Sequence, residues 1–308
     1  MDLTLLVQLL ISGILLGGIY ALASIGLTMI FGVMKVVNFA HGEFLMIAMY
    51  LTYWLFYYLH IDPYLCTLIL IPVMFLIGII TYYLFIRPTI GSSVLAQIFI
   101  TVGLSVIIQN LVLLLWSADF RSISLSYATE PIILGPLPAL GLGEIMVSPA
   151  RLIAFALAIL LSVVFYLFLE FSYTGKVIRA TSQDRSAALL MGINIDKVYA
   201  LTFAIGIVLT GLAGGLVLPI YTVQPFVGFD FVLIMFVVVV LGGMGSVVGA
   251  MISGFIIGVV EVLSSYWIGQ ENKQAIYFLV FIAVLVVRPS GLFGLKEEEE
   301  LERIETID

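Results

Sequence analysis

Residues 171–197, FSYTGKVIRATSQDRSAALLMGINIDK, are polar and basic in a chain that is otherwise strongly apolar. They include four of the twelve lysines and arginines, and long apolar segments precede and follow them. Small or apolar residues recur at steps of three, four and seven, the spacing of an amphipathic helix. Gly192 supplies a helix stop, so the pattern predicts one short helix over 175–192. On the basic side of a membrane protein, such a helix is suited to docking a cytosolic partner.

The composition of the whole chain indicates a membrane protein. Apolar residues make up 63% of the 308 residues and charged residues 10%, with a mean hydropathy of +1.24. Soluble domains carry about 25% charged residues, so this chain needs lipid around it. We therefore predict an all-α, polytopic transmembrane helix bundle. One cysteine and two histidines exclude a disulfide framework and a cysteine-based metal site, and we expect no metal, no cofactor and no catalytic residue.

The apolar segments predict eight or nine membrane crossings, because one crossing helix needs about 20 apolar residues. The segments are 3–33, 43–59, 64–86, 94–116, 152–171, 198–221, 229–263 and 275–287. The segment 229–263 is interrupted by Gly242-Gly243-Met244-Gly245. A single crossing would place the C-terminal basic residues outside, so we predict a glycine-broken helix pair near 242–245, as two crossings or as two half-helices. Small residues at four-residue spacing, such as Gly13 with Gly17, predict close helix crossings.

Basic residues orient the bundle, because short cytoplasmic loops are enriched in lysine and arginine. With the N-terminus outside and two crossings within 229–263, nine of the twelve basic residues fall inside. Arg121, Arg151 and Lys273 fall outside. Residues 1–296 then form one transmembrane domain, with the segment 171–197 in the cytoplasm and the loop 117–150 on the extracytoplasmic side. An acidic cytoplasmic tail follows at 297–308.

A polar segment, NFAHGE at 38–43, lies just beyond the first apolar segment. Asn38, His41 and Glu43 are candidates to line a translocation path as a gate on the cytoplasmic side. The alternative is a capped helix start, in which Asn38 or His41 accepts backbone donors and Glu43 complements the helix dipole. A metal site is not expected, because no third ligand lies near His41 and Glu43 in the sequence.

Further path candidates are polar residues within apolar segments. Four of them recur every four residues and form one slanted stripe on a helix: Gln97, Thr101, Ser105 and Gln109. Polar side chains are costly in lipid, so the stripe faces the bundle interior. There it either lines a path for a polar solute or bridges helices by hydrogen bonds. Glu261 is a single carboxylate within a late segment, and it lies either in the path or at the membrane interface.

The chain lacks the motifs of the main alternative classes. No GxxxxGK[ST] phosphate loop is present, and the basic residues are too few for nucleic-acid binding. A membrane enzyme needs clustered His, Asp or Glu, which the sequence does not supply. Two transport classes remain. One is the pore subunit of an ATP-driven importer whose ATPase is a separate chain. The other is an ion-coupled secondary transporter, which the glycine break favours and the shortage of intramembrane charges opposes.

Four motifs resemble the permease family of branched-chain amino-acid ATP-binding cassette (ABC) importers. They are NFAHGE at 38–43, the GK…RA…D…AA…GIN pattern at 175–194, TFAIGIVLTGLAGG at 202–215 and LGGMGSVVGA at 241–250. The resemblance implies the smaller of two permeases in a bacterial inner (plasma) membrane, carrying leucine, isoleucine and valine. Related permeases carry urea, short amides or other amino acids. The implied partners are a second homologous permease, two cytosolic ABC ATPases and an extracytoplasmic substrate-binding protein, besides membrane lipid.

The resemblance also assigns ATPase coupling to particular residues of the basic stretch. They are Gly175, Arg179, Asp184, Ala187, Gly192 and Asn194. In this interpretation Gly175 and Gly192 bound the helix, and Ala187 allows a partner groove to approach closely. Arg179 and Asp184 pair with each other or across the interface. The alternative is an ordinary cytoplasmic loop.

Overall fold

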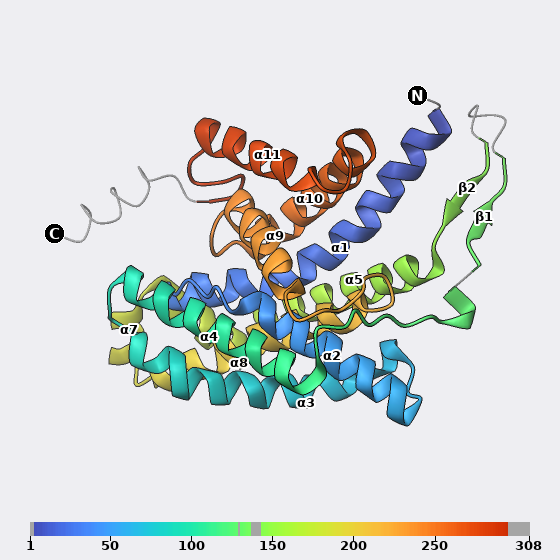
Figure 1. Cartoon of the computed structure of the whole chain (residues 1–308). Helices are drawn as coiled ribbons and strands as arrows, with labels where there is room; N and C mark the ends of the chain where they lie inside the picture. The colour runs from blue at the N-terminus through green and yellow to red at the C-terminus, as the bar shows by residue number, and fades with distance from the viewer. Residues whose placement is uncertain (1–2, 129, 137–142, 295–308) are drawn as a thin grey trace.

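The computed structural model describes residues 3–128, 130–136 and 143–294, and the acidic tail expected at 297–308 lies outside this range. The described chain is a helical bundle with one β-hairpin (Figure 1). Its helices are α1 Leu3–Met34, α2 His41–Leu59, α3 Pro63–Thr81, α4 Val94–Trp116, α5 Pro149–Phe171, α6 Tyr173–Gln183, α7 Arg185–Leu190, α8 Ile195–Val217, α9 Val227–Gly242, α10 Val247–Ile268 and α11 Lys273–Val287. The strands are β1 Ile132–Leu134 and β2 Ile145–Val147.

The helices confirm the expected all-α membrane bundle. Six described helices are long and apolar enough to cross a membrane: α1, α3 with the turns that extend it to Thr89, α4, α5, α8 and α10. α9 and α11 are shorter apolar helices, and α2 has 19 residues. The predicted segment 94–116 coincides with α4, because Ser93 caps its start and polar residues follow Trp116.

The apolar segment 229–263 forms two helices, so the alternative of a single crossing helix is wrong. α9 ends at Gly242, residues 243–246 turn the chain, and α10 begins at Val247. Gly243 and Gly245 have φ angles of 96° and 94°, in the left-handed region that glycine adopts without a steric cost. After the turn, α10 packs back on α9, and Gly242 contacts the backbone of Gly249.

α1 and α8 form the centre of the bundle. α1 packs against α10, α8, α5 and α9, and α8 packs against α3, α1 and α2. The crossing of α1 and α10 brings backbone against backbone, as the glycine spacing predicts. A Cβ atom on Gly17 would lie 2.7 Å from Cα of Phe255 and 2.8 Å from the carbonyl oxygen of Gly254. The close approach therefore depends on the missing side chain.

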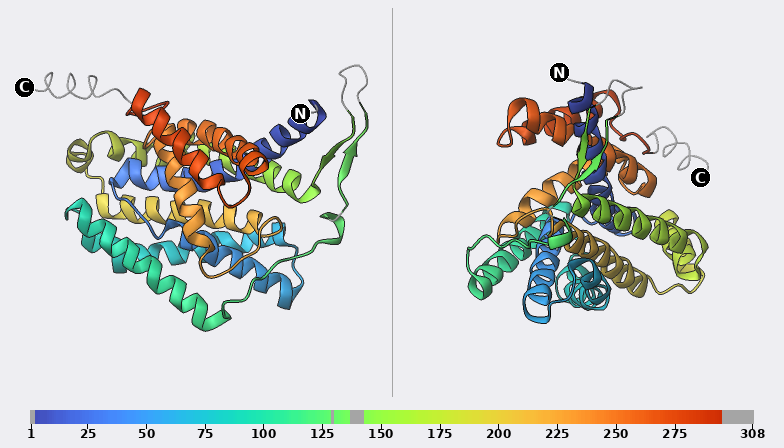
Figure 2. Two further views of the ribbon diagram at one scale, coloured as in Figure 1. Left: turned by 45° about the horizontal axis from the view of Figure 1, so that its top comes forward. Right: turned by 90° about the vertical axis from the view of Figure 1, so that its right-hand side faces the viewer.

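The two ends of the bundle differ. α7 lies at one end, and the β-hairpin lies at the other, beside the N-terminal part of α1 (Figures 1 and 2). Ile145 and Val147 of β2 pack against Leu15 of α1. Before the hairpin, the backbone of Arg121 exchanges two hydrogen bonds with Val223, which ties the loop after α4 to the segment between α8 and α9.

Candidate translocation path and docking surface

α2 begins inside the bundle, because the segment 35–40 turns back from the end of α1 (Figure 2). His41, the first residue of α2, is fully buried, and its Nε2 lies 2.5 Å from Oγ1 of Thr210 in α8. Phe39 packs against Phe236 of α9, with ring centroids 4.9 Å apart. The NFAHGE segment therefore lies in the interior, and not at the cytoplasmic end of α1 where its place in the sequence puts it.

The same segment has only part of the expected capping geometry. Oδ1 of Asn38 accepts a hydrogen bond of 3.1 Å from the backbone N–H of Ala40, the residue before α2. No side chain caps the first turn of α2 itself. The carboxylate of Glu43 turns away from the backbone and toward α4, so its role is not that of a capping group alone.

Glu43 joins the two polar patterns that the sequence presents separately. Its Oε1 accepts hydrogen bonds from Oγ of Ser105 at 2.9 Å and from Nε2 of Gln109 at 2.7 Å. Its Oε2 is buried without a hydrogen-bond partner among the described residues and lies against Gly228 at the start of α9. Ser105 is the twelfth of 23 residues in α4, so this carboxylate sits near the middle of a crossing helix. We call the contact of α2 with α4 around Glu43 the polar seam.

The other two stripe residues lie nearer the start of α4 and bond to backbone carbonyls. Oγ1 of Thr101 lies 3.0 Å from the carbonyl oxygen of Gln97 and 3.4 Å from that of Val37. Nε2 of Gln97 donates to the carbonyl of Thr89 at 3.4 Å. Gln97 and Thr101 are both buried, so the stripe does face the interior.

Glu261 is buried within the bundle, with 2% of its surface exposed. Its Oε1 forms an ion pair of 2.6 Å with Nζ of Lys273, the first residue of α11. The pair joins α10 to α11 and involves no residue of the polar seam. Sequence reasoning missed this partner, although Lys273 follows Glu261 by 12 residues across a short turn.

The basic stretch folds into two short helices, so the prediction of one helix over 175–192 is wrong. Asp184 has extended backbone, with φ −149° and ψ 106°, and separates α6 from α7. Its Oδ1 accepts hydrogen bonds from the backbone N–H groups of Ser186 at 2.7 Å and Ala187 at 2.9 Å. An aspartate that caps a helix satisfies donors left free at its start, and this cap outweighs continuation of α6.

The bounds of these helices also differ from those expected. Gly175 lies inside α6, and Ser172 caps the helix through a hydrogen bond from the Gly175 N–H to its Oγ at 2.9 Å. Gly192 does follow the end of α7, with a φ of 77°. Oδ1 of Asn194 accepts from the N–H of Lys197 at 3.1 Å, which makes Asn194 the cap of α8.

Arg179 does not pair with Asp184. Its guanidinium instead forms an ion pair with the carboxylate of Glu170 at the end of α5 and donates to the Glu170 carbonyl at 3.0 Å. Arg179 therefore ties α6 to α5. A cavity of about 500 Å³ lies behind this tie, lined by residues of α1, α5 and α6 and by the glycine turn 244–248.

The outer face of the stretch is apolar where α7 ends. Leu189, Leu190 and Met191 are 54%, 89% and 82% exposed, and Ala187 is exposed beside them. The sequence pattern assigns Leu190 and Met191 to an apolar helix face, and the structure leaves that face uncovered. We call these four residues the docking surface.

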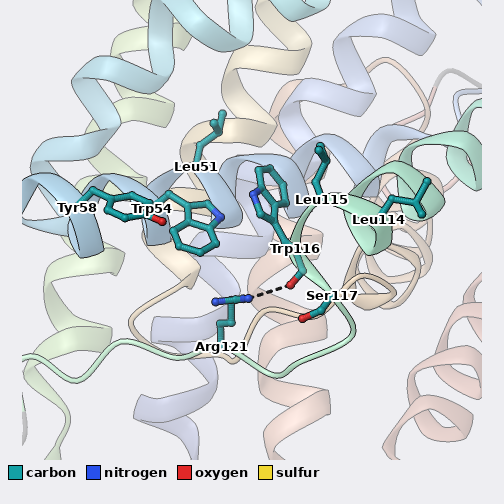
Figure 3. A pocket seen from close by; sticks show the side chains of 8 residues that line it. All are labelled: Leu51, Trp54, Tyr58, Leu114, Leu115, Trp116, Ser117 and Arg121. Atoms are coloured by element: carbon teal, nitrogen blue, oxygen red, sulfur yellow. Dashed lines mark hydrogen bonds between the residues drawn. The ribbon is translucent and has the colours of Figure 1, made fainter.

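A second cavity, of about 650 Å³, lies where α2 and α4 end, away from α7 (Figure 1), and its lining is drawn in Figure 3. It is lined by Leu51, Trp54 and Tyr58 of α2, Leu114, Leu115 and Trp116 of α4, and Ser117 and Arg121. Sequence reasoning missed this aromatic pocket, because its members come from two helices and a loop. Arg121 enters the sequence analysis only as a basic residue on the outer side.

Comparison with known proteins identifies the family. A family model described as "Branched-chain amino acid transport system / permease component" matches residues 9–285. The chain is 32% identical to the high-affinity branched-chain amino acid transport system permease protein LivH of Salmonella typhimurium, over 96% of this chain and 97% of the relative. It is 30% identical to the corresponding protein BraD of Pseudomonas aeruginosa, with the same coverage of both chains.

A shorter similarity reaches a sugar permease. The ribose import permease protein RbsC of Haemophilus influenzae is 29% identical over 47% of each chain. No solved structure matches this chain at a significant level. The family match covers most of the chain, and the long apolar helices place it in the cell membrane as a multi-pass protein. The chain therefore belongs to the family of permease components of branched-chain amino acid transport systems.

Proposed function

We propose that this chain is a membrane-spanning permease subunit of an ABC importer that carries the branched-chain amino acids leucine, isoleucine and valine into the cell. The observation that carries the proposal is the family match over residues 9–285, together with relatives of the same length that are named for this transport. The proposed partners are a second homologous permease, two cytosolic ATPases and an extracytoplasmic substrate-binding protein. Residues 1–296 act as one transmembrane domain.

The ATPases dock on α6 and α7. Three features support this assignment: the stretch is the most basic part of the chain, its two helices are capped at Ser172 and Asp184, and the docking surface is apolar and exposed. Movement of α6 reaches the crossing helices through the tie from Arg179 to Glu170. The cavity between α6 and the glycine turn leaves room for such a movement.

The solute passes along the polar seam. Support comes from the burial of a carboxylate halfway along α4, at the point where two further helices, α2 and α9, begin. Helices that begin or end inside a membrane leave backbone groups available to a solute, as in other transporters. Reorientation of α2 against α4 then opens the seam to one side of the membrane or the other.

The test is purification of the full chain at native expression level, followed by reconstitution of whatever copurifies with it. We expect a second apolar permease and P-loop ATPases in the complex. Vesicles that contain the complex and the binding protein should accumulate leucine only when ATP is supplied. Leucine uptake without ATP would overturn the importer assignment in favour of a secondary carrier. ATP-driven uptake of urea or short amides, with none of leucine, would overturn the substrate assignment alone.

A further inference from the structure

The aromatic pocket at the outer ends of α2 and α4 has the composition of a small-molecule site. Its volume of about 650 Å³ lies within the range of ligand pockets. Leu51 and the rings of Trp54 and Trp116 supply apolar walls, and Leu114 and Leu115, which are 83% and 68% exposed, lie at the open edge of the pocket. One cationic group, the guanidinium of Arg121, lies beside the two indoles and contacts the ring of Trp54 (Figure 3).

Arg121 is held firmly in this position. Its backbone is fixed by the two hydrogen bonds with Val223. Its guanidinium lies 4.8 Å from the ring centre of Trp54 and 5.4 Å from that of Tyr53, and Nη2 donates to the Trp116 carbonyl at 2.9 Å. The indole of Trp116 in turn stacks on Tyr50, with centroids 4.7 Å apart. A guanidinium that is placed in advance loses little entropy when it binds a ligand.

Arg121 forms no ion pair within the described chain, where no carboxylate oxygen lies within 4.0 Å of its guanidinium nitrogens. The carboxylate of Asp119 instead accepts a hydrogen bond of 2.5 Å from Oγ of Ser117, which also lines the pocket. Guanidinium groups bind carboxylates through N–H donors, and Arg121, whose Nη2 also donates to the Trp116 carbonyl, lines this pocket. A ligand that fits both parts has one carboxylate and one apolar side chain. A free apolar amino acid has this form.

We propose that the aromatic pocket is the site where the permease first receives an apolar amino acid, with Arg121 binding its α-carboxylate and Leu51 and the two indoles contacting its side chain. The proposal rests on the proposed function, because it takes the transported solute as its ligand. The pocket lies at the end of the polar seam away from the docking surface, and α2 and α4 line both. A solute that leaves the pocket along these helices meets Glu43.

The pocket can be tested by tryptophan fluorescence of the full chain in lipid nanodiscs. The chain has three tryptophans, two of which line the pocket. The third, Trp267, is 71% exposed at the end of α10, so Trp267→Phe leaves only the pocket indoles to report. We expect leucine to change the emission saturably. Leucinamide has the same side chain and no carboxylate. Its half-saturation concentration should be about tenfold higher, which corresponds to about 1.4 kcal/mol of binding free energy.

Variants of Arg121 separate recognition from structure. Arg121→Gln should raise the half-saturation concentration of leucine about tenfold and leave that of leucinamide unchanged, since a charge-assisted hydrogen bond to the carboxylate is lost. Arg121→Lys keeps the charge, and its half-saturation concentration for leucine should lie between those of the parent and of Arg121→Gln. Arg151→Gln, which removes an arginine that does not line the pocket, is the matched control and should bind like the parent.

Three results would overturn the proposal. The first is equal half-saturation of leucine and leucinamide in the parent, which needs no variant at position 121. The second is an equal shift for both ligands in Arg121→Gln, which would make Arg121 a structural residue. The third is an emission change on replacing phosphatidylcholine by phosphatidylglycerol with none on adding leucine, which would make the pocket a lipid headgroup site. Leucine binding without ATP-driven leucine uptake would instead retain the pocket and reject the proposed function.

Discussion

Glu43 has two buried carboxylate oxygens, of which Oε1 accepts two hydrogen bonds and Oε2 accepts none among the described residues. A buried polar atom without a partner costs free energy, and carboxylates inside membranes usually serve transport or proton movement. A role in packing alone would not require a carboxylate, because a glutamine at this position would accept the same two hydrogen bonds. The presence of a carboxylate at this position therefore supports a role in the translocation path.

We expect Glu43→Gln to keep the amount of membrane-inserted protein and to lower leucine uptake at least tenfold. The amide oxygen still accepts from Ser105 and Gln109, whereas Oε2 is replaced by an amide nitrogen that can neither accept a hydrogen bond nor take up a proton. Uptake by reconstituted vesicles, normalised to permease content, is the measurement. Gln97→Leu provides the comparison, since Gln97 makes only a hydrogen bond of 3.4 Å and should matter less. Normal uptake by Glu43→Gln would show that the polar seam serves helix packing and not the translocation path.

Gly192 occupies a left-handed conformation at the end of α7, and a Cβ atom there would contact nothing within 4 Å. Gly192→Trp therefore adds a bulky, strained residue beside the docking surface without disturbing the bundle. We expect normal insertion and ATP hydrolysis that no longer drives uptake. Gly192→Asn is the matched control, because asparagine tolerates this conformation and is small. The assay is the ratio of leucine transported to ATP hydrolysed, and an unchanged ratio in Gly192→Trp would remove the coupling assignment.

Among the elements, the crossing of α1 and α10 tolerates little added volume. A Cβ atom on Gly17 would lie within 3.0 Å of two backbone atoms of α10, and backbone cannot move aside as a side chain does. We expect Gly17→Ala to destabilise the bundle by about 1–3 kcal/mol, the usual cost of overpacking. Gly103→Ala in α4 is the control, because a Cβ atom there has open space around it. Thermal aggregation of the two purified variants in one detergent compares them, and equal transition temperatures would contradict this prediction.

We expect the ion pair between α5 and α6 to matter more for transmitting movement between these helices than for stability. The side chains of Arg179 and Glu170 are 40% and 43% exposed, and ion pairs this exposed contribute about 0–1 kcal/mol. Glu170→Gln should therefore leave the thermal stability nearly unchanged and lower the leucine transported per ATP. A double-mutant cycle with Arg179→Gln measures the coupling of the two residues. Additive effects on transport would show that α6 moves α5 through other contacts.

At the scale of the whole molecule, the sequence predicts the helices well and their depth poorly. Apolar runs of the right length located α4 and most other crossing helices, because lipid imposes that length. The split of the basic stretch at Asp184 was missed, since a single capping side chain interrupts a pattern that is otherwise continuous. The turn at 243–246 divides the apolar segment 229–263 into α9 and α10, because Gly243 and Gly245 adopt left-handed backbone that the hydropathy pattern does not record.

The depth of the NFAHGE segment could not be predicted from the sequence, for a different reason. Hydropathy records which residues tolerate lipid, and polar residues next to an apolar run are placed at the surface by default. Here the partners that make His41 and Glu43 acceptable in the interior lie in α8 and α4, 169 and 62 to 66 residues away. No local pattern contains that information. The aromatic pocket escaped notice for the same reason, as α2, α4 and a loop each supply part of it.

Because these residues are far apart in the sequence, their contacts form in a fixed order while the chain is being synthesised. When α2 leaves the ribosome, the helices that satisfy Glu43 and His41 have not yet been synthesised, and Thr210 is the last of their partners to emerge. Until then the first two helices carry polar groups that lipid does not solvate. The nascent chain must keep α2 within the insertion machinery, or in contact with a chaperone, until α8 arrives. Chains that terminate before α8 should therefore be degraded by membrane proteases faster than chains that terminate after it.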